Sequence, residues 1–73
     1  MTWRFPAIPE LVTPDVAARI KWLRCSLGAS WRMVAGDIYD HLGLSDEWAP
    51  PTNQLAGREL CEAAADVLGE EID

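Results

Sequence analysis

Three stretches of the sequence carry apolar residues at helical spacing, and each one is bounded by helix start and stop signals. Thr13 with Pro14 precedes the first stretch, and Ser30 precedes the second. Such residues satisfy or remove the free N–H groups of a first helical turn, and glycine is favoured just past a helix end. The stopping glycines are Gly28, Gly43 and Gly69. We therefore predict helices over residues 14–27, 31–42 and 53–69.

The chain has 73 residues, which makes it one small domain with a marginally sufficient core. Apolar residues make up 49% and charged residues 25%, a composition that excludes a disordered chain. Four tryptophans can add buried area, and small residues in the third predicted helix permit close helix–helix approach. These small residues are Ala56, Gly57, Ala63, Ala64 and Ala65. We expect an all-α fold, a compact three-helix bundle.

Proline punctuates the first thirteen residues, with Pro6 and Pro9 followed by Pro14. This pattern predicts an extended N-terminal arm over residues 1–13, packed on the three-helix domain of residues 14–73. The connection before the third helix contains Ser45–Trp48, which favours one capped helical turn with Trp48 at the edge of the core. We expect residues 70–73 to form an acidic, frayed end.

No apolar run reaches the ~18–20 residues that span a bilayer, and the first residues lack the apolar stretch of a signal peptide. These features predict a cytoplasmic protein without a membrane partner. In that compartment Cys25 and Cys61 stay reduced, with one internal disulfide as the alternative. A zinc site is disfavoured because His41 is the only other strong nitrogen or sulfur ligand.

The sequence shows no catalytic constellation. His41 lies at helical spacing from Asp37 and Asp40, which is typical of a surface histidine near a helix C-terminus. Nothing in the spacing brings either cysteine to His41 with a third orienting group. We therefore expect no enzyme activity, no cofactor and no small-molecule substrate.

Residues 20–35 join a helix end, a glycine-containing turn, a serine cap and an apolar–alanine pair. Over residues 15–69 the chain resembles helix-turn-helix domains, and the segment is also similar to short uncharacterised proteins of bacteria and their phages. The resemblance implies that residues 53–69 occupy the recognition position, with Asn53, Gln54 and Arg58 toward base edges. Asn53 and Gln54 also suit the start of a helix, and this is the favoured interpretation of the two residues. The chain departs from that pattern in its connection of about ten residues where the family has 3–4.

Charge divides the chain into unlike halves. Residues 1–36 hold five basic and two acidic residues, whereas residues 37–73 hold one basic and ten acidic residues. The whole chain carries a formal charge of −6, and a negative field is a poor match for duplex DNA. The acidic third helix could imitate nucleic-acid charge, although a solvated acidic face is the simpler interpretation.

Two functional hypotheses follow. The first is a regulatory module that binds a protein, or a second copy of itself, through a patch off the predicted core faces: Trp22, Arg24, Arg32 and Met33. Tryptophan, methionine and arginine are favoured at interface centres. Its structural alternative is that the N-terminal arm covers Trp22. The second hypothesis is a dimeric DNA-binding regulator, whose contacts would come from Arg4, Arg19, Lys21, Asn53, Gln54 and Arg58.

Overall fold

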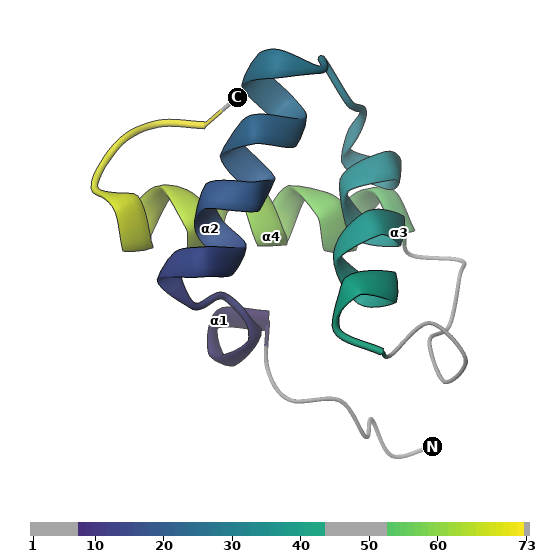
Figure 1. The fold of residues 1–73 in the computed structure, drawn as a ribbon, viewed down its shortest axis with the longest axis horizontal. Helices are drawn as coiled ribbons and strands as arrows, with labels where there is room; N and C mark the ends of the chain where they lie inside the picture. Colours follow the sequence, from purple (N-terminus) through teal and green to yellow (C-terminus); the bar gives the residue numbers. More distant parts are fainter. Residues whose placement is uncertain (1–7, 44–52, 73) are drawn as a thin grey trace.

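Two helices joined by a short turn lie side by side over a third helix that runs across both of them (Figure 1). This computed structural model describes residues 8–43 and 53–72 of the chain. Within these ranges the elements are helical and no strand occurs. They are α1 (Ile8–Leu11), α2 (Pro14–Lys21), the π-helical turn η1 (Trp22–Ser26), α3 (Trp31–His41) and α4 (Asn53–Leu68). The predicted all-α, three-helix fold is confirmed.

Local capping chemistry accounts for the helix ends. The Thr13 hydroxyl accepts a hydrogen bond from the Val16 N–H at 3.3 Å, and the Ser30 hydroxyl accepts one from the Met33 N–H at 3.2 Å. The glycines at the three ends, Gly28, Gly43 and Gly69, have φ between 65° and 76°. This left-handed conformation is the one in which glycine ends a helix without steric cost. The predicted start and stop signals therefore act as expected.

The first long helix is continuous in direction, but its last turn is wider than an α-helical turn. The Leu27 N–H donates to the carbonyl of Trp22 at 3.3 Å, a spacing of five residues that defines a π-turn. The Ala29 N–H then donates to the Leu23 carbonyl at 2.9 Å and closes the end of the helix. The sequence predicted a regular α-helix over residues 14–27, whereas the structure has a wider π-helical turn, η1, in the second half of this helix.

The core lies where α2 and α3 face α4. Helix α4 makes most of the tertiary contacts with both neighbours, whereas α2 and α3 contact each other little. The side chains without any exposure come from all three helices: Ala17, Ile20, Val34, Ala35, Ile38, Leu60 and Ala64. Tyr39 is also buried and is the largest side chain in this set of fully enclosed residues. Burial of these apolar surfaces is the main term that stabilises the fold.

The start of α3 crosses α4 at Gly57, where the two backbones touch. A Cβ placed on Gly57 would lie 2.9 Å from the Cα of Trp31 and closer still to its carbonyl group. Real Cβ atoms essentially never approach backbone atoms so closely. Glycine is therefore required here for space, and the predicted close approach along the small residues of α4 is confirmed at this position.

The N-terminal segment differs from its prediction in the part that is described. Residues 8–11 form one helical turn, where an extended arm was expected. Pro9 suggested an extended chain, but proline is tolerated in a first helical turn because that turn needs no N–H donor. Leu11 and Val12 pack against the core, and α1 contacts α4. Residues 1–7 and the predicted turn at 45–48 lie outside the described residues.

The C-terminal segment is ordered against the fold, so the prediction of a frayed end is wrong for residues 70–72. The chain turns back after α4 and approaches the upper end of the helix formed by α2 and η1 (Figure 1). Ile72 is buried in the core, and Glu70 forms an ion pair with Lys21. The acidic composition suggested a solvated end, but a single apolar residue and a single cation suffice to hold it.

We predict that alanine substitutions at two helical glycines change the free energy of unfolding in opposite directions. Gly57→Ala should destabilise the protein by about 1–3 kcal/mol because the new methyl group overlaps the backbone of Trp31. Gly36→Ala is the matched control, since nothing lies within 4 Å of its Cβ position, and it should stabilise α3 by about 0.5–1 kcal/mol. Urea unfolding measures both values. Equal effects of the two substitutions would contradict the backbone contact.

We also predict that the free energy of unfolding decreases at alkaline pH because of Tyr39. Burial, and secondarily the charge of Glu59, raises the pKa of the Tyr39 hydroxyl above its ordinary value of 10.0. A raised pKa in the folded state means that stability is complete below about pH 10 and declines as the pH rises further. Tyr39→Phe should flatten this decline between pH 9 and about 11 in urea unfolding. The same slope in both proteins would remove Tyr39 as its source.

Candidate functional site

The end of the molecule where η1 turns into α3 exposes large apolar side chains. Trp22 is 52% exposed, Leu27 59% and Met33 64%. Arg32 lies between them in sequence and is also exposed. We call these four residues the hairpin-tip surface. Contiguous exposed apolar surface can mark an interaction site, whereas single exposed apolar side chains are ordinary.

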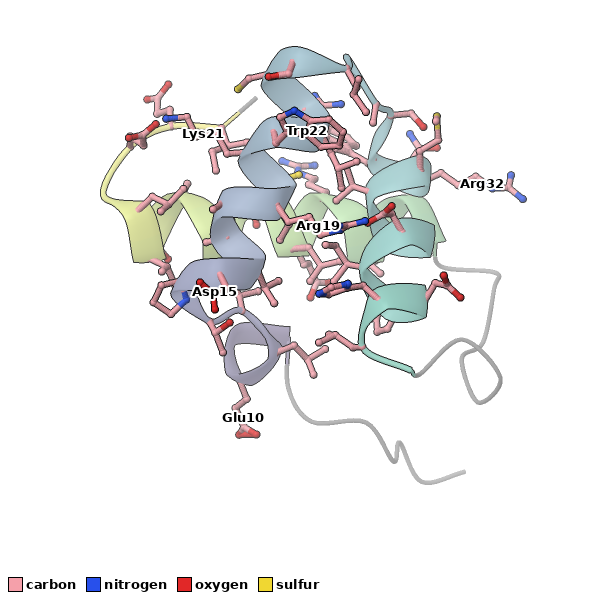
Figure 2. All side chains as sticks on the ribbon, viewed as in Figure 1. Glu10, Asp15, Arg19, Lys21, Trp22 and Arg32 are labelled. Carbon is pink, nitrogen blue, oxygen red and sulfur yellow. The ribbon has the colours of Figure 1, made fainter. Side chains whose placement is uncertain are left out.

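Helical geometry explains why these side chains point outward. Trp22 precedes the buried Leu23, and Met33 precedes the buried Val34, so each is turned about 100° from its core neighbour. Figure 2 shows Trp22 on the side of the helix pair that faces away from α4, and Arg32 extending outward from α3. The prediction that Trp22 and Met33 lie off the core faces is confirmed.

The alternative that the N-terminal arm covers Trp22 concerns a segment that is only partly described. Its described part, α1, contacts α4 and lies at the opposite end of α2 from Trp22 (Figure 2). Residues 1–7 lie outside the described residues. Among the described residues, Trp22 keeps half of its surface exposed.

Arg24 is the member of the predicted patch that the fold uses for itself. Its Nη1 donates to the carbonyl of Ala29 at 2.6 Å, and its guanidinium carbon lies 5.7 Å from the centre of the Trp31 ring. These contacts join η1 to the start of α3 and turn the side chain away from solvent. Its Nε is buried and has no partner within the described residues. Arg24 therefore supports the hairpin, whereas Trp22, Arg32 and Met33 form its outer surface.

The cations proposed to contact DNA are paired with carboxylates of the chain itself. Arg19 binds both oxygens of Asp37, at 2.6 and 3.1 Å, and Lys21 binds Glu70. Hydrogen bonding to Asp37 raises the pKa of Arg19, and hydrogen bonding to Glu70 raises that of Lys21. A phosphate would have to compete with these carboxylates for the same charge. Exposed pairs of this kind are weak, so the competition is partial.

The remaining DNA candidates lie on α4 or beyond the described positions. Arg58 faces Glu62 at 3.5 Å and lies 5.5 Å from the centre of the Trp31 ring. Gln54 is exposed at the start of α4. The predicted sites Arg4 and the side chain of Asn53 lie outside the described residues. The exposed residues of α4 include Glu59, Glu62 and Asp66, so the helix that was expected to occupy the recognition position is acidic.

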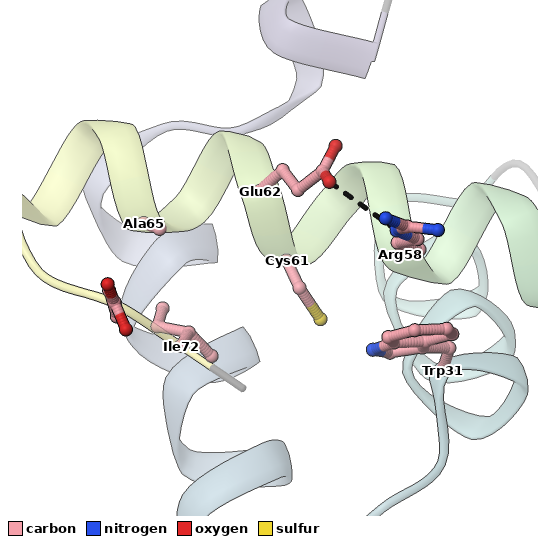
Figure 3. Close-up of a pocket in the computed structure, with 7 residues that line it drawn as sticks. Trp31, Arg58, Cys61, Glu62, Ala65 and Ile72 are labelled. Atoms are coloured by element: carbon pink, nitrogen blue, oxygen red, sulfur yellow. Dashed lines mark ion pairs between the residues drawn. The ribbon is translucent and has the colours of Figure 1, made fainter.

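A cavity that sequence reasoning missed lies beside α4. It has a volume of about 460 Å³ and is bordered by the start of α3 and by the C-terminal segment (Figure 3). Its lining residues are Trp31, Arg58, Cys61, Glu62, Ala65, Glu71 and Ile72. The sequence did not predict this cavity, because the C-terminal segment that borders it was expected to be a frayed end.

The remaining expectations from the sequence concern the two cysteines, a metal site and a membrane-spanning helix. Cys25 on η1 is exposed, Cys61 on α4 is buried, and the two do not form a disulfide. Within the described ranges no three histidine, cysteine or carboxylate groups lie close enough together to hold a metal ion. Nor does any helix of these ranges have the length and apolar content to cross a membrane.

Comparisons with models of protein families, with curated proteins and with solved structures found no match. The functional argument therefore rests on the geometry of the chain. Two features stand out within it, the hairpin-tip surface and the cavity beside α4. They share no residue, although both include residues from the first turn of α3.

We predict that the ion pairs of Arg19 and Lys21 govern any affinity for nucleic acid. The unaltered protein should not shift a random-sequence DNA duplex in a low-salt gel assay. The double variant Asp37→Asn, Glu70→Gln frees both cations and removes two negative charges, so it should bind weakly and release the duplex as salt rises. A salt-sensitive shift by the unaltered protein, equal to that of the variant, would contradict this prediction.

Proposed function

We propose that this chain is a small non-enzymatic regulatory module that binds a protein partner through the hairpin-tip surface. The observation that carries the proposal is the concentration of exposed apolar area there. Three large apolar side chains, each more than half exposed, fall within residues 22–33 together with the exposed Arg32. Aromatic, methionine and arginine side chains are the types that contribute most at the centres of protein interfaces.

Charge indicates what kind of partner fits. Residues 22–33 contain two arginines and no acidic residue. Arg24 is engaged within the hairpin, whereas Arg32 has no ion-pair partner among the described residues. A complementary partner therefore presents a carboxylate to Arg32 and apolar side chains to Trp22 and Met33. An acidic amphipathic segment of another protein has this chemistry.

A rigid frame supports the proposed surface. The Ser30 cap fixes the start of α3, and the bond from Arg24 to the Ala29 carbonyl ties the preceding turn to η1. A surface held in place before binding loses less conformational entropy when a partner docks. The proposal includes a cytoplasmic setting, which the absence of a disulfide between Cys25 and Cys61 supports because thiols persist in reducing compartments.

Selection from a library of random peptides displayed on phage tests the proposal directly. The unaltered protein should enrich peptides that combine Asp or Glu with Leu, Phe or Trp. Trp22→Ala should lower the affinity for the selected peptides at least tenfold, because central aromatic residues of interfaces often contribute 2 kcal/mol or more. Far-ultraviolet circular dichroism should be unchanged, since Trp22 lies outside the core.

Matched variants separate this surface from other exposed apolar residues. Leu55→Ala removes an apolar side chain of α4 that is 57% exposed and should leave peptide affinity unaltered. Arg32→Glu should weaken acidic peptides more than neutral ones. Enrichment of basic peptides, or equal losses in Trp22→Ala and Leu55→Ala, would refute the proposed surface. Selection of peptides that match the chain's own α4 would identify a second copy as the partner.

A further inference from the structure

The cavity beside α4 has the dimensions and the mixed lining of a small-molecule site. Its volume of about 460 Å³ lies within the ~300–1,000 Å³ typical of ligand pockets. Four lining residues are apolar or weakly polar: Trp31, Cys61, Ala65 and Ile72. Three are charged: Arg58, Glu62 and Glu71. The hairpin-tip surface contributes no residue to this cavity, so a ligand here would be independent of the proposed protein partner.

The orientation of the side chains divides the cavity into an apolar floor and a charged rim. Figure 3 shows the sulfur of Cys61 directed into the space between α4 and Trp31, with Ile72 facing it from the C-terminal segment. The nitrogen-bearing edge of the Trp31 ring is turned toward the same space. The exposed carboxylates of Glu62 and Glu71 border the opening.

The basic group at the rim is already engaged. The guanidinium of Arg58 lies over the Trp31 ring at 5.5 Å and faces Glu62 at 3.5 Å. Arg24 lies within 5.7 Å of the same ring, so two guanidinium groups already lie within cation–π distance of the indole. Glu71 has no ion-pair partner within the described residues. The charge left available to a ligand is therefore negative.

We propose that this cavity binds small primary amines that carry a short apolar or aromatic body. The ammonium group lies at the rim and is attracted by Glu71. The apolar body enters between Ile72 and the edge of Trp31, above Cys61 and Ala65. Anionic ligands are disfavoured because they would meet the carboxylate of Glu71 while Arg58 remains engaged with Glu62 and Trp31.

A series of three ligands with the same aromatic body tests the role of charge. The probes are 2-phenylethylamine, the neutral 2-phenylethanol and the anionic 3-phenylpropionate, added to the ¹⁵N-labelled protein. The indole N–H signal of Trp31, identified by its loss in Trp31→Phe, should shift in a saturable way with the amine. The amine should bind about two- to fivefold more tightly than the alcohol, as expected for an exposed ion pair. The carboxylate should bind more weakly than the alcohol.

Two glutamate variants assign the effect to the cavity. Glu71→Gln should reduce the affinity for the amine to that for the alcohol, whereas Glu59→Gln, which removes a carboxylate from the outward face of α4, should retain most of the difference. Trp22→Ala should leave amine binding unchanged even where it abolishes peptide binding, which separates this site from the proposed function. An unshifted Trp31 signal, equal binding of amine and carboxylate, or equal losses in the two glutamate variants would overturn the proposal.

Discussion

The contact between the backbone of Trp31 and Gly57 is the constraint on which the rest of the structure depends. It sets how closely the start of α3 approaches α4, and so it also places the Trp31 side chain. That side chain then contacts Arg58 of α4 and Arg24 of η1 and borders the cavity. The hairpin tip and the cavity are therefore built around one crossing of two helices, at a residue without a side chain.

The parts of this structure that sequence reasoning predicts are those set by local chemistry. Thr13 and Ser30 cap helices through bonds to N–H groups three residues away, so their role is readable from a few neighbouring positions. The outward placement of Trp22 and Met33 follows equally from helical periodicity. These features reproduce the predicted helices to within one or two residues and include most of the hairpin-tip surface.

The features that sequence reasoning missed depend on residues far apart in the chain. Composition assigns Lys21 and Glu70 to solvated faces, yet they meet because the chain reverses after α4. Ile72 is a single apolar residue among acidic ones, so the sequence pattern did not predict that it would be buried. The cavity forms because the C-terminal segment that carries Ile72 folds back beside α4. Arg24 resembles a surface cation until the carbonyl of Ala29 lies beside it. Helical periodicity predicts which face of a helix a side chain lies on, but not which distant residue that side chain will contact.

The arrangement of α2 and α3, which meet each other mainly through α4, has a consequence for how the protein is made. A ribosome releases the two antiparallel helices first, and at that stage their apolar faces have no surface to cover them. Only after the last helix and the returning Ile72 emerge can the core close. The core of this domain therefore closes only once α4 and residue 72 are available, and until then the apolar faces of the α2–α3 hairpin are exposed to chaperones and proteases.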